Sequence, residues 1–409
     1  MHIMFLSDNF PPEVNACASR VFERACYWVR WGHQVTVITC TPNFPEGKVY
    51  PGYQNKWYQV EFMEGIRIVR VKTFIAANHG TVLRIIDFIS YMLMAIIAGL
   101  WQKKPDVIVA TSPQFFAAVG GWMLSRFKRI PFILEISDLW PESILAVGAM
   151  QPSLLLRWLE RLELFLYHQA KHVIVLTHAF KKNLVARKVP DDKIHVIING
   201  VDLSRYRLMT KDPELLQYYS LQQKFVVGYI GTLGMAQDLI QILHAAKACR
   251  DQTHITFLFV GSGADAKLLQ QQIQLWQLSN VILIPRQPKS EIIRYWSLCD
   301  IGLVHLKNDA TFSSVLPSKL FEMMGMGLPI CCVAPPGEAT TLIDQTQAGI
   351  TLPAGNPQLL ADTLIQLSLQ PEQLAQWAAN SYRARQEFTR EYQARAMLQV
   401  FQDTISNLS

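Results

Sequence analysis

The sequence has few charged residues and lacks the segments that mark several common protein classes. Only 17% of its 409 residues are Asp, Glu, Lys or Arg, whereas half are apolar. We find no internal repeat, low-complexity tract, Walker loop, H-E-x-x-H pair or Ser-His-Asp order. The composition does not fit a multi-span membrane protein, and the missing patterns exclude a repeat protein and the enzymes that those motifs define. A chain of this length normally forms two domains.

The cysteines show neither C-x-x-C spacing nor His partners at zinc-ligand intervals, and their number, seven, is odd. We therefore expect reduced thiols in the cytosol and no metal ion. The N-terminal segment MHIMFLSDNFPPE lacks the charged start, apolar middle and small-residue cleavage site of a signal peptide. The sequence predicts a cytoplasmic protein.

Long hydrophobic runs are also scarce. Residues Phe88–Trp101 form an uncharged stretch, but a membrane-spanning helix needs about 20 apolar residues, so this stretch is too short to span. Two interpretations remain open, a helix buried against a parallel sheet and a helix that dips into a membrane surface. We favour the first.

The charge is unevenly distributed along the chain. Residues 1–200 contain 22 Lys and Arg against 15 Asp and Glu, whereas residues 201–409 contain 16 against 17. The basic first half suggests an anionic partner, such as membrane lipid or a phosphorylated acceptor, although a solvated face explains it equally well. No nucleic-acid motif accompanies these residues, so we expect no nucleic-acid partner.

Short apolar runs alternate with helical patterns, which predicts strand-helix-strand units and parallel sheets. In the first half these runs are HIMFLS from His2, HQVTVIT from His33, IRIVRV from Ile66, DVIVATS from Asp106, FILEIS from Phe132 and HVIVLT from His172. In the second half they are FVVGYIG from Phe225, ITFLFVG from Ile255, VILIP from Val281, IGLVHL from Ile301 and PICCVA from Pro329.

The pattern predicts two Rossmann-like α/β domains, over residues 1–200 and 201–380, with 381–409 as a C-terminal helix that can return to the first domain. The polar segment NGVDLSRYRLMTKDPE from Asn199 reads as a linker. Open parallel sheets bind ligands at the carboxyl ends of their strands, so we expect the site in a cleft between the domains.

Two loops of the second half follow strands and contain glycine. One is Gly231-Thr232-Leu233-Gly234, and the other is Ser262-Gly263. Glycine lets backbone amides approach an anion, and a helix N-terminus adds about half a positive charge, so phosphate fits such loops. Ordinary turn chemistry explains either loop taken singly.

A third candidate is the segment SVLPSKLFEMMGMGLP, in which Pro317, Ser318 and Lys319 open a helix. An amine at a helix start is electrostatically unfavourable unless an anion joins it, which again indicates phosphate. Glu322, one turn further, could accept hydrogen bonds from ribose hydroxyls, or it could serve only helix solubility.

In the first half, three acids lie near the end of one strand, in EISDLWPES. Glu135, Asp138 and Glu142 are candidates to orient or deprotonate an acceptor hydroxyl. A solvent-exposed turn is an equal alternative.

Eight segments carry a family resemblance, in the family's own order and over nearly the whole chain. They are FPPEVNACASR with GHQVTVIT, EISDLWPES, VIINGVDL, GYIGTLGMAQDL, FLFVGSG, CDIGLVHL, SKLFEMMGMGLPI and PPGEATTLI. Together they resemble a family 4 glycosyltransferase of the GT-B fold, and most of all the branch of sugar or amino-sugar transferases that assemble surface polysaccharides.

The resemblance implies a metal-independent enzyme without cofactor, which moves a hexose or an N-acetylated amino sugar from a UDP-sugar with retained configuration. The first domain would bind a lipid-linked or polysaccharide-precursor acceptor, and the second the nucleotide sugar. The basic first domain and residues 88–101 would hold the enzyme peripherally at the inner face of the cell membrane.

The resemblance also implies roles for single residues. Gly231, Thr232 and Gly234 would line the nucleotide, and Glu322 would hold the ribose. Amides of Ser318 and Lys319 would cap the diphosphate, and the Lys319 side chain would neutralise the leaving group. Asp138 or Glu142 would position the acceptor hydroxyl. The remaining substrate-binding candidates are Asn15, Ala16, Arg286 and Glu338.

The chain departs from the family at several positions. Asn15-Ala16 stands where many members carry Gly-Gly, Ser137 where many carry His, and Ser314 where the first of two glutamates is usual. Two other functions therefore remain open, a nucleotide-sugar 2-epimerase of the same fold and a nucleotide-sugar-binding protein without catalysis.

Overall fold

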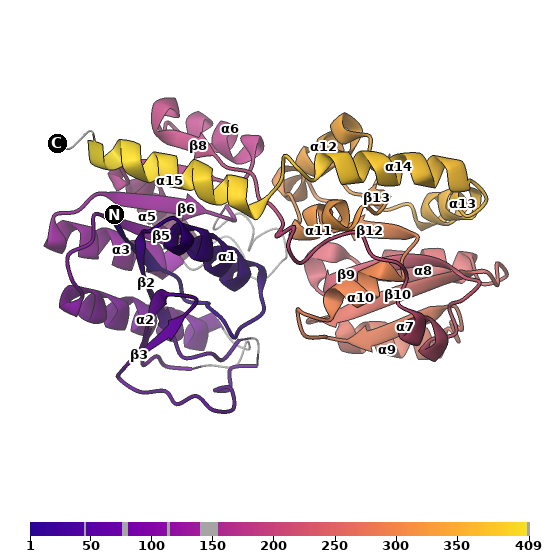
Figure 1. Cartoon of the computed structure of the whole chain (residues 1–409), viewed down its shortest axis with the longest axis horizontal. Helices are drawn as coiled ribbons and strands as arrows, with labels where there is room; N and C mark the ends of the chain where they lie inside the picture. The colour runs from indigo at the N-terminus through magenta and orange to yellow at the C-terminus, as the bar shows by residue number, and fades with distance from the viewer. Residues whose placement is uncertain (45, 76–80, 113–114, 140–153, 407–409) are drawn as a thin grey trace. The chain divides into compact units, whose positions relative to one another are not determined.

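The computed structural model describes residues 1–44, 46–75, 81–112, 115–139 and 154–406. Its contacts divide the chain into two compact units, each with its own sheet (Figure 1). Unit 1 comprises Met1–Ile198 and Arg390–Ser409, and unit 2 comprises Asn199–Thr389.

Unit 1 contains an eight-stranded sheet in the order β3-β4-β2-β1-β5-β6-β7-β8. Its elements are β1 (His2–Leu6), α1 (Ala16–Arg30), β2 (Gln34–Cys40), β3 (Tyr58–Met63), β4 (Ile66–Val71), α2 (Thr81–Trp101), β5 (Val107–Thr111), α3 (Phe115–Lys128), β6 (Phe132–Ile136), α5 (Leu154–Gln169), β7 (His172–Val175), α6 (His178–Ala186), η1 (Asp191–Lys193), β8 (Ile194–Val196) and α15 (Arg390–Ser406). The six strands expected from the sequence are present. β3, which runs antiparallel to β4, and the short β8 are additional.

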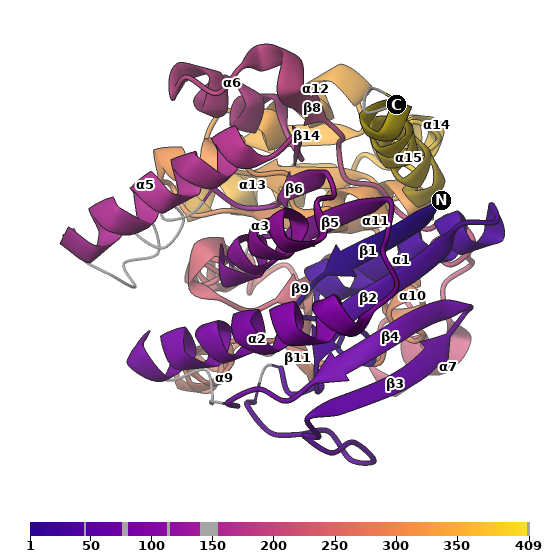
Figure 2. The same cartoon turned by 90° about the vertical axis from the view of Figure 1, so that its left-hand side faces the viewer.

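Helices cover both faces of this sheet, because its strands are apolar on both sides. One core cluster joins the sheet to α2, α3, α5 and α6, and the other joins it to α1 and α15. Figure 2 shows α2, α3 and α5 as successive helices of one layer.

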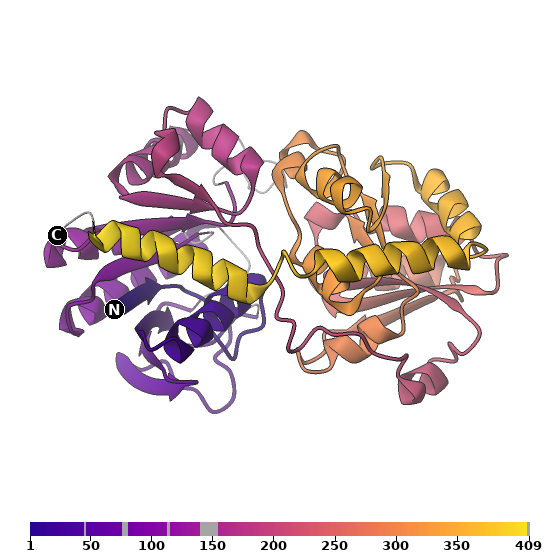
Figure 3. The same cartoon turned by 45° about the horizontal axis from the view of Figure 1, so that its top comes forward.

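The C-terminal helix α15 packs against α1 within unit 1 (Figure 3). The indole Nε1 of Trp28 donates a 2.8 Å hydrogen bond to the Ala394 carbonyl. Nearby, Arg390 and Glu23 form a buried ion pair at 2.9 Å. The end of the chain is therefore part of the core of unit 1.

Unit 2 contains a parallel six-stranded sheet in the order β11-β10-β9-β12-β13-β14. Its elements are α7 (Pro213–Tyr218), β9 (Phe225–Thr232), η2 (Met235–Gln237), α8 (Ile240–Ala248), β10 (Ile255–Ser262), α9 (Ala266–Leu275), β11 (Val281–Pro285), α10 (Ile292–Ser297), β12 (Ile301–His305), η3 (Ala310–Ser314), α11 (Ser318–Met326), β13 (Ile330–Val333), α12 (Glu338–Thr346), β14 (Gly349–Leu352), α13 (Pro357–Leu367) and α14 (Pro371–Ala384). β14 is the strand that the sequence pattern did not indicate.

The segment from Asn199 leads from unit 1 into unit 2, and part of it packs on unit 2. Val201 forms a bridge with Thr389, and Tyr206 is only 3% exposed. A Cβ added at Gly325 would lie 2.8 Å from the Tyr206 Cβ, so the segment packs closely on α11. The boundary between the units lies at the start of the segment, whose residues 199–201 and Tyr206 are buried, whereas residues 207–210 are exposed.

Helix α2 is longer than the uncharged stretch that the sequence analysis considered. Among the described residues, Leu83–Trp101 is the one helical window long and apolar enough to cross a membrane. Its inner side is nevertheless part of unit 1, since Tyr91 is fully buried and donates a 2.8 Å hydrogen bond to the Ile38 carbonyl. The helix is thus buried against the sheet on one side and exposed on the other.

Candidate functional site

The sheet of unit 2 changes winding direction between its central strands β9 and β12. From β9 the chain winds outward through β10 and β11, and from β12 it winds outward through β13 and β14. In open α/β sheets the carboxyl ends at such a point form the ligand site. The donor-site candidates of unit 2 lie at or beyond carboxyl strand ends. Gly231 and Thr232 end β9, Gly234 follows it, and Arg286 follows β11; Ser318, Lys319 and Glu322 lie in α11, between β12 and β13, and Glu338 starts α12 after β13.

Lys319 lies at the start of α11, beside the winding change. Its Nζ lies 3.4 Å from the ring centroid of Tyr229 on β9, and a Cβ added at Gly231 would be 3.0 Å from that nitrogen. The nitrogen is buried and has no hydrogen-bond partner among the described residues. Burial lowers the pKa of Lys319 to about 7, although the nearby Glu322 carboxylate opposes the shift. Lys319 therefore places a buried amine at the carboxyl end of β9.

Glu322 lies one turn beyond Lys319 and is half-buried, so it is not enclosed in the apolar interior. The indole Nε1 of Trp296 donates a 3.3 Å hydrogen bond to its Oε2. Burial raises the pKa of Glu322, and the Lys289 ammonium partly offsets this effect.

Two small residues let the helices that carry these groups approach the sheet. A Cβ added at Gly228 on β9 would lie 2.2 Å from the Cys299 sulfur, and one at Gly302 on β12 would lie 2.0 Å from the Met323 sulfur. Only glycine fits at both positions, and α11 can therefore place Lys319 directly at the end of β9.

The loops at the ends of β9 and β10 are joined by backbone contacts. The Leu233 amide donates to the Ser262 carbonyl at 2.9 Å. Added Cβ atoms at Gly261 and Gly263 would lie 1.9 Å and 2.1 Å from the carbonyl oxygens of Gly231 and Leu233. The glycines of the β10 loop are thus explained by loop packing, whereas Gly231, at φ +142, faces Lys319.

Sequence reasoning missed two residues of this site, Tyr229 and His305. Tyr229 donates its hydroxyl to the Thr232 carbonyl at 2.7 Å and presents its ring to Lys319. His305 ends β12, is 2% exposed, and pairs its Nδ1 with the Gln237 carbonyl at 2.7 Å. Burial lowers the pKa of His305. A polar residue near the carboxyl end of an apolar strand is the signal that could have identified both.

The other candidates of unit 2 have more varied surroundings. Thr232 is exposed, Gly234 is buried, and Arg286 is half-buried after β11. Glu338 is the first residue of α12, where Gly337 allows the Ser313 backbone to approach, since an added Cβ would lie 2.0 Å from the Ser313 carbonyl oxygen.

In unit 1 the winding changes between β1 and β5, and the loop after β1 leads into α1. Asn15 is the N-cap of α1 and accepts a 2.8 Å hydrogen bond from the Ala18 amide. Its side-chain amide also donates to Asn9. Ala16 is exposed at the first position of the helix. The local role of Asn15 is thus to cap the helix.

Asp138 follows β6 and is half-buried. Burial raises its pKa to about 6, although the Arg20 guanidinium opposes the shift. It lines a small cavity whose other walls include Phe115, Leu134 and Ile136. Glu142 lies outside the described residues.

Glu135 is not available to an acceptor, so this candidate was wrong. It is fully buried and receives two hydrogen bonds from Arg24, at 2.7 Å and 2.8 Å, while Arg20 lies 3.2 Å away. Burial alone would raise the pKa of Glu135, but the two guanidinium groups outweigh it and hold the value at about 2. Glu135 is an internal anchor for α1.

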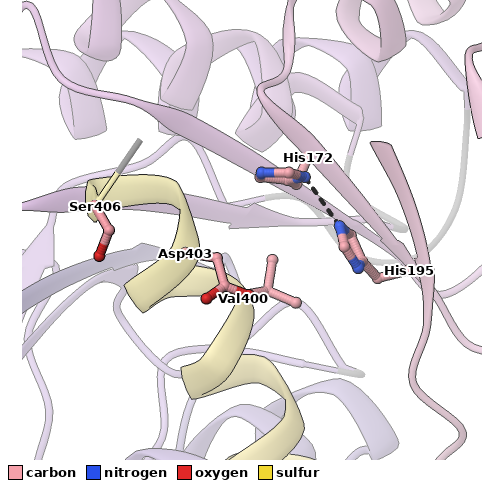
Figure 4. Close-up of a pocket in the computed structure, with 5 residues that line it drawn as sticks. All are labelled: His172, His195, Val400, Asp403 and Ser406. Atoms are coloured by element: carbon pink, nitrogen blue, oxygen red, sulfur yellow. Dashed lines mark hydrogen bonds between the residues drawn. The ribbon is translucent and has the colours of Figure 1, made fainter. Parts of the chain in front are cut away.

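A cavity of about 410 Å³ lies elsewhere in unit 1, lined by His172, His195, Val400, Asp403 and Ser406 (Figure 4). His195 Nε2 and His172 Nδ1 form a 2.9 Å hydrogen bond. Burial and the neighbouring His195 lower the pKa of His172 to about 4. None of the predicted site residues lines this cavity, and the described residues contain no cluster of three or more His, Cys, Asp or Glu that could hold a metal.

The proteins whose sequences resemble this chain are sugar transferases. The family described as Glycosyltransferase Family 4 matches residues 18–205, and the one described as Glycosyl transferases group 1 matches residues 213–384. A colanic acid biosynthesis glycosyl transferase of Escherichia coli (strain K12) is 25% identical over 80% of this chain and 82% of its own length. A GDP-mannose-dependent α-mannosyltransferase of Mycobacterium tuberculosis is 23% identical over 87% of this chain and 84% of its own.

Solved structures agree at the level of the fold. Sucrose-phosphate synthase from Thermosynechococcus elongatus has a TM-score of 0.80 at 15% identity and covers 99% of both chains. Anabaena HepE in complex with UDP-glucose has a TM-score of 0.71 at 18% identity and covers 100% of both chains. Fold and relatives together define a GT-B glycosyltransferase.

The chain belongs to the family 4 glycosyltransferases, and several of its relatives are described as glycosyltransferases of polysaccharide biosynthesis. This confirms the family and the two Rossmann-like domains expected from the sequence. The site residues, and the cleft between the units, stay predictions.

Proposed function

We propose that the protein is a retaining glycosyltransferase that moves a hexose or an N-acetylated amino sugar from a UDP-sugar to a lipid-linked or polysaccharide-precursor acceptor. The observation that carries this proposal is the buried Lys319 Nζ, which has no hydrogen-bond partner among the described residues and lies where the sheet of unit 2 changes winding.

The donor diphosphate would give the Lys319 ammonium a hydrogen-bond acceptor. It would accept from the first amides of α11, whose N-terminus carries a partial positive charge, and from the Lys319 ammonium. Negative charge on the diphosphate grows as its bond to the sugar breaks, so both groups stabilise the transition state more than the bound donor. Glu322 would accept from the ribose hydroxyls.

The nucleotide base is proposed to be uracil, with guanine as the alternative. The complex of HepE with UDP-glucose supports uracil through the shared fold, whereas a relative of similar coverage is described as GDP-mannose-dependent. Direct comparison of both donors decides between them.

The transfer requires no metal ion and no obligatory side-chain base. The C1–oxygen bond to the diphosphate breaks, the acceptor oxygen bonds to C1 on the same face, and the hydroxyl proton passes to the departing phosphate oxygen. Asp138, with its pKa of about 6, is mostly ionised at neutral pH and could orient that hydroxyl. In this proposal the acceptor is carried by a membrane lipid, and the enzyme works peripherally at the inner face of the cell membrane.

Transfer assays with membrane acceptors and a panel of UDP- and GDP-sugars test the proposal, run with and without a chelator. We expect one UDP-sugar to be used with retention of configuration, and chelation to have no effect. Lys319→Ala should lower the turnover about 10²–10³-fold, whereas Lys267→Ala, which removes an exposed lysine on α9, should not.

Three results would contradict the proposal. Equal turnover in Lys319→Ala and the wild type would show that Lys319 does not stabilise the departing diphosphate. Conversion of a UDP-sugar to an epimer without acceptor identifies an epimerase. Donor binding without transfer to any acceptor identifies a binding protein.

A further inference from the structure

His305 is the last residue of β12, the strand that lies beside β9 at the winding change of unit 2. Its side chain is buried, and its Nδ1 lies 2.7 Å from the Gln237 carbonyl oxygen. A carbonyl oxygen only accepts hydrogen bonds, so Nδ1 carries the proton and donates it. In a neutral imidazole the other nitrogen, Nε2, then bears a lone pair and can only accept.

The surroundings of His305 keep its ring neutral. Burial lowers the pKa of His305 from 6.5, and the Lys319 ammonium acts in the same direction, whereas the Gln237 carbonyl and Asp238 oppose the shift. The ring therefore carries no charge at neutral pH and is not a second cation for a diphosphate. What it offers to a ligand is the lone pair of Nε2.

This lone pair is not used within the protein. Nε2 has no hydrogen-bond partner among the described residues. Unlike the Lys319 nitrogen, it is not a fully enclosed atom, so the 2% of His305 that solvent reaches includes Nε2. Buried acceptors are normally paired, and this one is available to a donor group that enters the site.

The ring is held rigidly at this place. The turn η2, which follows β9, is tied to the end of β12 by two hydrogen bonds, one from His305 Nδ1 to Gln237 and one of 2.9 Å from the Lys307 amide to the Ala236 carbonyl. The first bond fixes the orientation of the imidazole. The second is made by backbone alone, so it persists when the histidine is replaced.

Lys319 lies between His305 and Glu322. Burial is the largest cause of the pKa shifts of both groups, and the Lys319 ammonium acts on both, but Glu322 does not act on His305. In the proposed donor complex Glu322 holds the ribose and Lys319 the diphosphate. The next group of a nucleotide sugar, beyond the diphosphate, is the sugar itself, and it would meet His305.

We propose that His305 is a specificity-determining residue of the donor site, where its Nε2 accepts a hydrogen bond from a hydroxyl of the donor sugar. A site that pairs a buried acceptor with a substrate hydroxyl discriminates against a sugar that lacks this hydroxyl, because the acceptor is then left unpaired. Since the position of the sugar follows from the donor assignment, this role of His305 deepens the proposed function and rests on it.

Calorimetry of the full chain with UDP and with UDP-glucose separates the sugar contact from the nucleotide contacts. His305→Asn should leave the affinity for UDP within about twofold and weaken UDP-glucose about three- to tenfold, the effect of one hydrogen bond. The asparagine amide can donate to the Gln237 carbonyl as Nδ1 does, but it is too short to reach the position of Nε2. His305→Gln reaches that position with an amide oxygen and should restore most of the lost affinity.

Analogues of UDP-glucose that each lack one hydroxyl identify the group that meets His305. One of them should bind the wild type about three- to tenfold more weakly than UDP-glucose, and His305→Asn should bind these two ligands equally. The matched control is His254→Asn. His254 is a half-buried histidine directly before β10, at the amino end of the strands, and its Nε2 pairs with Ser368 Oγ at 2.9 Å. This variant should bind both ligands like the wild type, and thermal unfolding of every variant reports whether the fold is kept.

Equal weakening of UDP and UDP-glucose in His305→Asn would show that the histidine only fixes η2, and it would overturn the proposal. So would an unchanged affinity for UDP-glucose. Either result with normal UDP binding by the wild type removes only the role of His305, whereas a wild type that binds neither ligand removes the donor assignment itself.

Discussion

At the scale of single residues, the Lys319 side chain is buried, lies against an aromatic ring, and belongs to the first turn of α11, where the helix N-terminus carries a partial positive charge. The side chain faces Tyr229 on β9, Glu322 on its own helix and the buried His305 on β12. Of these, the Glu322 carboxylate and the face of the Tyr229 ring favour the protonated amine, but burial outweighs the carboxylate and lowers the pKa. The free site is therefore close to half-protonated at neutral pH.

Binding of UDP-glucose should consequently depend on pH. A diphosphate favours the protonated amine, and the pKa of Lys319 in the free protein is about 7. Affinity should thus be constant below that value and fall as pH rises above it, by up to about tenfold per pH unit. Calorimetry between pH 6 and 8 measures this, because UDP-glucose itself does not titrate there.

Lys319→Arg is the matched variant, since a guanidinium stays charged over this range. Its binding should be independent of pH. A flat profile for the wild type would show that Lys319 is already fully charged in the free protein, or that it does not meet the diphosphate.

Glu135 gives a prediction about stability. Glu135→Gln leaves Arg24 and Arg20 buried beside a neutral group, and breaking a buried pair in this way costs about 3–5 kcal/mol. Because the folded pKa of about 2 lies below the unfolded value of 4.5, the carboxylate stabilises the fold above pH 4.5, and this contribution is lost as pH falls towards 2.

Urea unfolding of Glu135→Gln at pH 7 and pH 4 measures both effects. The variant should unfold at lower urea, and the difference from the wild type should shrink at the lower pH. Glu214→Gln is the control, because Glu214 is 83% exposed in its pair with Arg294, and surface pairs contribute at most about 1 kcal/mol. Similar losses in both variants would contradict the role of burial.

At the scale of elements, the donor loop depends on the contact between the ends of β9 and β10. In Gly261→Ala the new Cβ would lie 1.9 Å from the Gly231 carbonyl oxygen, and backbone on both sides has little room to shift. We expect a loss of roughly 2–4 kcal/mol of stability and at least tenfold weaker UDP-glucose binding, because Gly231 also faces Lys319.

Gly120→Ala in α3 is the comparison, since its Cβ would meet atoms no closer than 3.5 Å. Alanine in a helix interior with that much space should be neutral or slightly stabilising. Denaturant unfolding and calorimetry on both variants provide the readout. Wild-type nucleotide binding in Gly261→Ala would show that the two loops are not coupled.

The elements themselves were largely predictable from the sequence. Apolar runs bounded by turn residues identify strands that are buried on both faces, such as β5 and β9. β3 was not predicted because it is an edge strand of mixed polarity, and β8 was not predicted because it has only three residues.

The position of Lys319 at the start of a helix was also predicted, from Pro317. Its contact with Tyr229 was not, because it depends on which strands are neighbours in the sheet.

At the scale of the whole molecule, the chain passes from one unit to the other twice, near Asn199 and near Thr389. These two passages lie together on unit 2: Val201 bridges Thr389, and its amide donates to the Phe388 carbonyl at 2.9 Å. A Cβ added at Gly200 would lie 2.6 Å from the Thr389 carbonyl. Unit 2 therefore begins and ends at one place and encloses a complete sheet and core.

We accordingly expect residues 199–389 to fold as an isolated polypeptide with one cooperative unfolding transition. The fragment contains Lys319, Glu322 and the β9 loop, so it should bind UDP-glucose within about threefold of the full chain. It should transfer no sugar, because it lacks unit 1, which is proposed to bind the acceptor. The complementary fragment 1–198 should be unstable, since without α15 the Trp28 indole loses its acceptor and Glu23 loses Arg390. Circular dichroism and calorimetry on both fragments measure these outcomes. A fragment 199–389 that folds but does not bind UDP-glucose would show that unit 1 supplies part of the donor site.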